Sequence, residues 1–148
     1  IVKNEPYLIE FNVRMGDPEC QTILPILDTD LAEIILACCN KKLQDIDIKW
    51  KNKKSVCIVL CSNGYPDSYK KNIIINDLKN LKIDRNEYIF HAGTVIKDDK
   101  YLAIGGRVLN VIVTTENFKN SKDKAIKILN DLDWKDGFFR KDIAYKVT

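Results

Sequence analysis

The sequence has few of the residues that build metal centres and disulfide frameworks. It contains one histidine, His91, and five cysteines, an odd number with no pair in a C-x-x-C arrangement. A zinc site needs about four ligands of these types at characteristic spacings, so such a site is poorly supported. Cys38 and Cys39 are adjacent in a helical pattern, and Cys57 and Cys61 lie in an apolar run. We therefore expect reduced cysteines that are mostly buried and act as small hydrophobic residues.

Long apolar runs are also absent. No segment approaches the roughly 20 apolar residues that a membrane helix requires, and no basic, apolar leader precedes the first predicted strand. The formal net charge is only +3, from 24 basic and 21 acidic residues, and the lysines are scattered among aspartates and asparagines. Composition therefore favours a cytoplasmic protein that binds neither membranes nor nucleic acids. Because the chain begins with Ile1 and not with Met, we expect that an upstream region is missing.

A segment near the N-terminus alternates between apolar and polar residues. Glu10, Asn12 and Arg14 share one side of it, and apolar residues share the other. This pattern predicts a strand over Tyr7–Val13, with its polar side chains in a row about 6 to 7 Å apart. Carboxylate and amide oxygens suit Mg²⁺, and a guanidinium suits phosphate or carboxylate groups. The row is therefore either a metal and phosphate site or the solvent-exposed face of an edge strand.

The residues after this strand have the pattern of a turn followed by a helix. Gly16 allows a sharp turn, and Asp17 is a suitable N-cap residue. Pro18 fits the first helical position, and Glu19 favours the positive end of the helix dipole. We therefore expect a helix that starts at Asp17 and is interrupted by Pro25.

A second helix is predicted after this interruption. Asp30, followed three residues later by Glu33, has the pattern of a capping box. A lysine-rich polar segment, Lys41–Lys54, then separates the helical patterns from a stretch that contains short apolar runs. The sequence therefore predicts a domain boundary, with residues 1–50 ending one domain and residues 51–148 forming another.

The second part predicts several short strands and one long helix. Apolar or alternating runs occur at Ser55–Ser62, Ile73–Ile75, Glu87–Val95, Tyr101–Ile104 and Arg107–Thr115. "NGYP" at Asn63–Pro66 predicts a turn, and "KDDK" at Lys97–Lys100 predicts a hairpin between the third and fourth of these strands. Ser121–Leu132 has one apolar helical face that should pack on the sheet. The aromatic residues expected to close the core are Trp134, Phe138 and Phe139. This part predicts an antiparallel sheet with helical cover, which is an α+β fold.

Five segments occur in the order found in one known family. They are "EFNVRMGDPECQTILPIL" (Glu10–Leu27), "NGYP" (Asn63–Pro66), "HAGT" (His91–Thr94), "GGRVLNV" (Gly105–Val111) and "FRKDIA" (Phe139–Ala144). Together they closely resemble the C-terminal third of glycinamide ribonucleotide synthetase (phosphoribosylamine glycine ligase), an ATP-grasp enzyme of purine biosynthesis. The resemblance spans essentially the whole chain, and its departures, Met15 and Cys20, concern packing more than chemistry.

The resemblance implies an α+β fold class in two parts. The first is the last strand and helices of an ATP-grasp domain, and the second is a small C-terminal domain with a mainly antiparallel sheet and helical cover. It also implies an N-terminal domain, a nucleotide-clamping lid and most of the ATP-grasp domain upstream. The chain would then be a fragment that is inactive by itself.

Enzymes of this family phosphorylate the glycine carboxylate with ATP, and the amine of 5-phosphoribosylamine attacks the glycyl phosphate. The resemblance thus implies ATP, glycine and 5-phosphoribosylamine as substrates, with the upstream domains as partners. Glu10 and Asn12 would be ligands of Mg²⁺ (or Mn²⁺) at the ATP phosphates, and Arg14 would be the catalytic residue at the transferring phosphoryl group.

The resemblance also implies three substrate-binding residues: Asp17, Glu19 and Arg107. Helix capping is the alternative role for Asp17 and Glu19, and pairing with an acidic residue is the alternative for Arg107. His91 is expected to make a structural hydrogen bond. Arg140 and Asp142 are expected to form a local ion pair near the C-terminus. Two other functions stay open: another ATP-grasp carboxylate ligase, and a non-catalytic interaction module.

Overall fold

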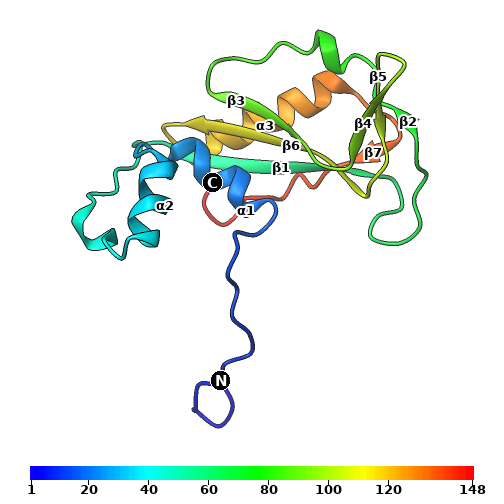
Figure 1. Cartoon of the computed structure of the whole chain (residues 1–148). Helices are drawn as coiled ribbons and strands as arrows, with labels where there is room; N and C mark the ends of the chain where they lie inside the picture. The colour runs from blue at the N-terminus through cyan, green and yellow to red at the C-terminus, as the bar shows by residue number, and fades with distance from the viewer.

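Two nine-residue strands lie side by side at the centre of the computed structural model, which describes residues 1–148: β1 (Lys54–Ser62) and β6 (Arg107–Thr115). They pair antiparallel, and β3 (Glu87–His91) and β7 (Gly137–Phe138) complete a four-stranded sheet in the order β3-β6-β1-β7 (Figure 1). Both central strands are mostly buried, as expected for apolar runs covered on both faces. The sequence prediction of these two strands is confirmed.

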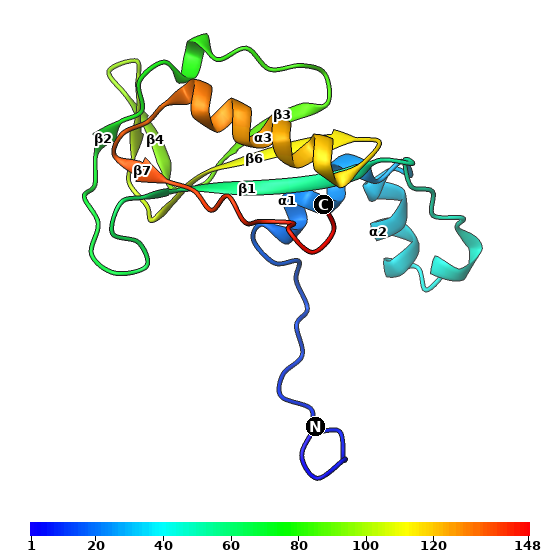
Figure 2. The same ribbon diagram turned by 180° about the vertical axis from the view of Figure 1, so that it is seen from behind.

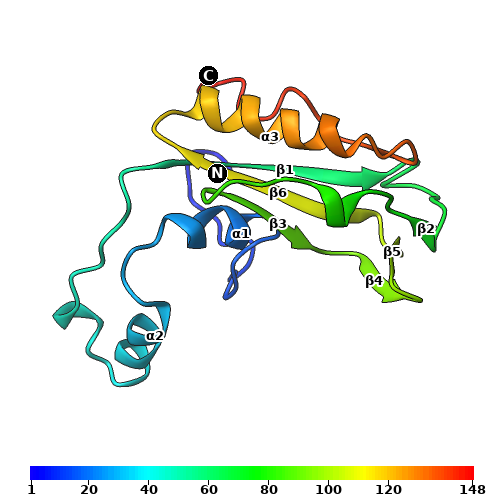
Figure 3. The same cartoon turned by 90° about the horizontal axis from the view of Figure 1, so that it is seen from above.

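The helix α3 (Phe118–Leu132) covers one face of this sheet (Figure 3). Its buried residues recur every three or four positions: Ser121, Ala125, Ile128, Leu129 and Leu132. The four apolar residues among them share one cluster with Ile58 and Leu109 of the central strands, and burial of each large aliphatic side chain stabilises the fold by about 1.5–3 kcal/mol. The helix starts three residues before the predicted Ser121 because the Asn117 side chain accepts a hydrogen bond from Asn120 N at 2.8 Å and caps it.

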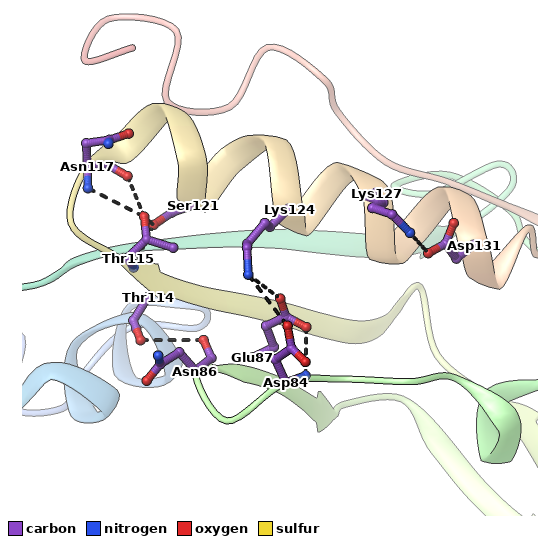
Figure 4. Close-up of polar contacts among 10 residues, drawn as sticks. All are labelled: Asp84, Asn86, Glu87, Thr114, Thr115, Asn117, Ser121, Lys124, Lys127 and Asp131. Atoms are coloured by element: carbon purple, nitrogen blue, oxygen red, sulfur yellow. Dashed lines mark hydrogen bonds and ion pairs between the residues drawn. The ribbon is translucent and has the colours of Figure 1, made fainter.

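Polar contacts fix the position of α3 on the sheet (Figure 4). At its first turn, Ser121 Oγ donates to Lys54 O at 2.7 Å and accepts from Thr115 N at 3.0 Å. Further along, Lys124 Nζ lies 3.2 Å from Glu87 Oε1 on β3. The helix is thus bound by polar contacts to β1, to β6 and to the edge strand β3.

A three-stranded antiparallel sheet packs beside the first, in the order β2-β5-β4. Its strands are β2 (Ile73–Ile74), β4 (Thr94–Lys97) and β5 (Lys100–Ala103). The predicted hairpin is confirmed, and its two turn residues, Asp98 and Asp99, have positive φ angles of 49° and 58° as tight hairpin turns require. Trp134 is buried as predicted and donates from Nε1 to Ile74 O at 2.9 Å, but Phe138 is 39% exposed and does not close the core.

The single strand predicted at Glu87–Val95 is wrong, because the chain leaves one sheet at His91 and enters the other at Thr94. Gly93 lies at this crossing, where its N–H donates to Arg107 O at 2.8 Å. A Cβ atom at Gly93 would lie 2.5 Å from Gly105 Cα, closer than real Cβ atoms approach. The two glycines therefore allow two backbones to pass in contact, which the alternation of side chains does not reveal.

The N-terminal helices lie away from α3. Figure 3 shows α1 (Glu19–Ile23) on the face opposite α3, while α2 (Leu31–Cys39) lies beyond the edge of the sheet. A short 3₁₀ turn at Leu24–Ile26 contains Pro25 and separates them, as predicted. Asp30 caps α2 by accepting from Ala32 N at 2.7 Å, which confirms its predicted role. Two more 3₁₀ turns occur at Leu43–Asp45 and Leu78–Asn80. None of the helices is long and apolar enough to span a membrane.

Residues 1–15 form an extended arm that projects from the body (Figure 1), and Figure 2 shows the same arm from behind. The strand predicted over Tyr7–Val13 is not formed, since no other segment pairs with it; the arm contains only an isolated bridge between Val2 and Glu5. A strand needs a neighbour for its N–H and C=O groups, and these 148 residues place none beside the arm.

Candidate active site

The predicted metal and phosphate residues lie along the arm and are all exposed to solvent. The Arg14 amide donates weakly to Asn12 Oδ1 at 3.3 Å, and Arg14 Nη1 donates to Met15 O at 3.3 Å. Neither contact involves Glu10, and the chain contains no group of three or more His, Cys, Asp or Glu side chains that could hold a metal ion. The structure therefore does not bring Glu10 and Asn12 together into a formed site.

The donor chemistry of the two residues nevertheless fits Mg²⁺. A carboxylate and an amide oxygen are hard ligands, and Mg²⁺ in proteins keeps several waters and is bound by one or two carboxylates plus substrate phosphates. A site completed by phosphate oxygens and water requires only that the arm be held rigidly. In these 148 residues the arm makes no hydrogen bond with the body that would hold it in this way.

The turn from Gly16 to Glu19 joins the arm to α1. Glu19 Oε2 accepts a hydrogen bond from Gly16 N at 2.6 Å, and Cys20 N donates to Gly16 O at 2.9 Å. The prediction that Asp17 caps the helix is wrong: the N-cap position is occupied by Pro18, with no side-chain capping hydrogen bond. The carboxylate of Asp17 is oriented by other contacts.

Arg107, the first residue of β6, binds Asp17 across 90 positions of sequence. Its Nη2 lies 3.1 Å from Asp17 Oδ2, and its Nη1 donates to Asp17 O at 3.2 Å. The other carboxylate oxygen, Oδ1, accepts from Gln21 Nε2 at 2.9 Å. Both oxygens of Asp17 are thus engaged within the chain, and Arg107 makes the ion pair that the sequence left as its alternative role.

A mostly apolar cavity of about 400 Å³ lies beside this turn, between the start of α1, one face of β1 and the C-terminal segment. Its lining residues are Pro18, Cys57, Val59, Cys61, Tyr65, Pro66, Phe138, Arg140 and Ile143. Burial raises the pKa of the Cys57 thiol from 9.0 to about 11, against a hydrogen bond with Thr22 that lowers it. Burial also raises the pKa of Cys61, and the nearby Arg107 charge opposes that shift. Both thiols are therefore protonated at neutral pH and are poor nucleophiles.

The remaining sequence predictions concern side chains outside this turn. His91 makes the expected structural contact, with Nδ1 2.8 Å from Thr94 Oγ1 and its ring stacked on Tyr101. Arg140 and Asp142 form the expected local ion pair, with Nε donating to Oδ1 at 3.0 Å. The prediction of mostly buried cysteines is wrong for the α2 pair, because Cys38 and Cys39 are exposed.

Two residues near the candidate site are not anticipated by the sequence analysis. Gln21 stands four residues after Asp17, a helical spacing that places two side chains on the same face, so this partner has a signal in the sequence. Asn110 is fully buried in the middle of β6, and neither its Nδ2 nor its Oδ1 has a hydrogen-bond partner. In the sequence, the only indication of this residue is an asparagine inside an otherwise apolar run.

Comparison with known proteins identifies a consistent set of relatives. The sequence model of the family described as phosphoribosylglycinamide synthetase, C domain, matches residues 55–146. A phosphoribosylamine–glycine ligase of Brucella melitensis is 37% identical over 148 residues, which cover 100% of this chain and 35% of that protein. A protein of the same name from Caldanaerobacter subterraneus is 39% identical over 144 residues, which cover 97% of this chain and 34% of that protein.

A solved structure gives the same result at the level of the fold. The crystal structure of phosphoribosylamine–glycine ligase from Thermotoga maritima matches with a TM-score of 0.70 and 28% identity, over 96% of this chain and 34% of that chain. The two sequence relatives are matched over almost the whole of this chain, arm included. The chain spans about a third of the length of these relatives.

Proposed function

Because the chain belongs to the phosphoribosylglycinamide synthetase C-domain family, we propose that it is the C-terminal part of a phosphoribosylamine–glycine ligase. The observation that carries this proposal is the extent of the similarity. The Brucella melitensis relative is 37% identical over all 148 residues, so the similarity includes the arm as well as the domain at residues 55–146. The proposed reaction joins glycine to 5-phosphoribosylamine with ATP and gives glycinamide ribonucleotide, ADP and phosphate.

In this proposal the chain's own residues bind and orient the phosphates. Glu10 and Asn12 would hold Mg²⁺, or Mn²⁺, and the metal would supply positive charge at the ATP phosphates. Arg14, next in the row, contacts the phosphoryl group during its transfer to the glycine carboxylate, because a planar guanidinium can donate to several oxygens at once. Phosphoryl transfer depends mainly on positioning and charge stabilisation, which such a row would provide once upstream residues hold the arm.

Asp17 and Glu19 are the proposed substrate-binding residues. Both carboxylates lie at the base of the arm, near the proposed phosphate residues in sequence, where they can attract the ammonium group of an amine substrate. In the structure both are engaged in hydrogen bonds within the chain, to Gln21 and to Gly16. A substrate amine would therefore compete with or add to these contacts.

Exposed apolar residues in the N-terminal part support the proposal that further protein covers it. Ile9 is 95% exposed, Phe11 80% and Val13 93%, on the side of the arm opposite the polar row. Leu36 of α2 is also exposed, at 62%. Clustered exposed apolar side chains commonly mark a surface that another protein segment covers. We therefore propose that residues 1–50 complete an ATP-grasp domain formed by upstream residues, and that residues 51–148 are the separate C-terminal domain, in a cytoplasmic enzyme.

The experiment that tests this function is glycine-dependent release of ADP by the full-length protein that contains these residues. The protein is supplied with Mg-ATP and 5-phosphoribosylamine, with and without glycine. The 148 residues alone are expected to be inactive, and the full-length protein is expected to release ADP only when glycine is present. Release that depends on a different carboxylate substrate would indicate another ATP-grasp ligase. No ADP release with any carboxylate would favour an interaction module.

A substitution tests the metal assignment separately. Glu10→Gln removes the charged ligand but keeps the size of the side chain, so we expect near-total loss of turnover with the fold retained, as measured by circular dichroism. The matched control is Glu116→Gln, because Glu116 is an exposed carboxylate that pairs with Lys53 far from the arm. Unchanged turnover in Glu10→Gln would exclude this residue as a metal ligand.

A further inference from the structure

Within these 148 residues, a single turn attaches the arm to the body. Every hydrogen bond made by residues 1–15 stays within residues 1–15: the Val2–Glu5 bridge, the Asn12–Arg14 contact and the Arg14–Met15 contact. The arm therefore has no polar contact of its own with the body. Its orientation follows from the turn at Gly16–Glu19 that connects it to α1.

Arg107 is the only side chain of the sheet that makes a hydrogen bond or ion pair with this turn. The contacts of Gly16 with Glu19 and Cys20, and of Asp17 with Gln21, are local and close the turn upon α1. The bonds from Arg107 to Asp17 are different, because Arg107 belongs to the central strand β6. Arg107 is thus the polar link between the base of the arm and the C-terminal sheet.

The link is geometrically specific although it is partly exposed. The side chains of Arg107 and Asp17 are 43% and 42% exposed, so their charge attraction is screened by water and is weak as a source of stability. The two guanidinium nitrogens, however, bind the carboxylate and the backbone carbonyl of the same residue. A planar fork fixes both the side chain and the main chain of Asp17, which a lysine ammonium cannot reproduce.

The base of the fork is also rigid. The carbonyl oxygen of Arg107 accepts a hydrogen bond from Gly93 N at 2.8 Å, at the crossing where the backbones of Gly93 and Gly105 are in contact. The backbone of Arg107 therefore cannot shift without disturbing the junction of the two sheets. A rigid backbone with a forked side chain is suited to holding another segment in place.

We infer that Arg107 is a positioning residue of the proposed ligase: it holds Asp17 and thereby fixes the turn from which the arm that carries Glu10, Asn12 and Arg14 enters the rest of the enzyme. This inference rests on the proposed function and assigns Arg107 a role that acts through Asp17 instead of through contact with a substrate phosphate. The C-terminal domain then contributes to catalysis without contacting the substrates, because it fixes the turn at the base of the phosphate-binding row.

The test is a double-mutant cycle in the full-length protein with Arg107→Met, Asp17→Asn and their combination. Misplacing a catalytic row by about 1 Å costs about 100-fold in rate, so Arg107→Met is expected to lower kcat by about 100-fold. The KM for 5-phosphoribosylamine should change by less than about threefold, because no substrate contact is removed. In the Asp17→Asn background, Arg107→Met should lower kcat by no more than about threefold, because the side chain through which Arg107 acts is already altered.

Two further measurements separate positioning from a general loss of structure. Arg107→Lys keeps the positive charge on a single nitrogen and should recover part of kcat, about tenfold over Arg107→Met. Amide hydrogen exchange of Cys20, whose N–H is bound to Gly16 O, should be faster in Arg107→Met while exchange in β1 is unchanged. The control is Lys127→Met, which removes an exposed lysine–aspartate pair on α3, on the opposite face of the sheet, and should leave kcat and Cys20 exchange unchanged.

Opposite results would overturn the inference. If Arg107→Met raised the KM for 5-phosphoribosylamine by tenfold or more at unchanged kcat, and multiplied with the Asp17→Asn effect, Arg107 would contact substrate. The proposed function would still stand in that case. If the unaltered full-length protein released no ADP, the proposed function would fail, and the inference about Arg107 would fail with it.

Discussion

Lys124 of α3 and Glu87 of β3 form an ion pair across the helix–sheet interface, with 3.2 Å between Nζ and Oε1 (Figure 4). The side chain of Glu87 is only 8% exposed, and its second oxygen, Oε2, accepts from Asp84 N at 2.9 Å. The hydrogen bond and charge of Glu87 raise the pKa of Lys124. The pair therefore satisfies a buried carboxylate while it connects the helix to the edge of the sheet.

Lys124→Met is expected to destabilise the protein, because it leaves the buried carboxylate of Glu87 without its cation. Since the folded-state pKa of Lys124 is raised, the stabilisation is fully present below its ordinary pKa of 10.5 and is lost as pH rises through the folded value. Urea unfolding at pH 7 and at pH 11 measures the difference. The control is Lys119→Met, which breaks an exposed pair with Asp123 and should have a smaller effect at pH 7. Equal losses in the two variants would contradict the prediction.

Asn110→Val is expected to stabilise the protein. The buried amide of Asn110 lacks partners for both polar atoms, and an unsatisfied buried polar group costs about 1–3 kcal/mol. Valine also fits a strand better. Thermal unfolding should therefore show a higher Tm. Asn130→Val, on the exposed side of α3, is the matched control and should change little, because Asn and Val have similar helix propensities. A lower Tm in Asn110→Val would mean that the amide is satisfied by bound water.

Gly93→Ala is expected to be strongly destabilising. The new Cβ would lie 2.5 Å from Gly105 Cα and 2.7 Å from Arg107 O, and both of these are backbone atoms that cannot rotate away. Overpacking of this kind costs about 3 kcal/mol, which chemical denaturation can measure. In Gly16→Ala, by contrast, the nearest atom is the flexible carboxylate of Glu19, so that variant should unfold near the native midpoint. A native-like midpoint for Gly93→Ala would show that the two backbones can separate without cost.

The five cysteines are expected to differ in their rates of alkylation. At pH 8 the exposed pair on α2, Cys38 and Cys39, should react rapidly, and Cys57 should react slowly because it is buried and its pKa is about 11. Burial of a neutral thiol favours the folded state below pH 9, and that contribution is lost as pH rises toward 11. Iodoacetamide labelling followed by peptide mass spectrometry measures each rate. Labelling of Cys57 as fast as Cys38 would contradict its placement under α1.

The sequence predicted the elements whose signals are local. The bounds of β6 could be predicted because a short run rich in valine and other β-branched residues stands between "GG" and a polar loop. Asp30 could be predicted as a cap because Glu33, three residues later, completes a capping-box pattern. The break at Gly93 was missed because its cause is another backbone, that of Gly105. A close approach between distant segments leaves no periodic signal.

The candidate site shows the same division. The chemistry of Glu10, Asn12 and Arg14 can be recognised from their alternation, but the strand that should carry them needs a pairing partner that these 148 residues do not provide. The capping role of Asp17 was wrong because Arg107, far away in sequence, binds its carboxylate instead. Local propensity is a weak guide wherever a distant residue competes for the same group.

The unpaired arm also has a consequence for the solution behaviour of these residues in isolation. Its main chain has free N–H and C=O groups along an extended segment, beside apolar side chains such as Ile9 and Val13 that are almost fully exposed. A segment of this kind is a template for strand addition between molecules, so isolated copies should aggregate through their arms as concentration rises. The same main-chain groups that would pair with a neighbouring strand in the proposed full-length ligase thus favour self-association of the isolated 148 residues.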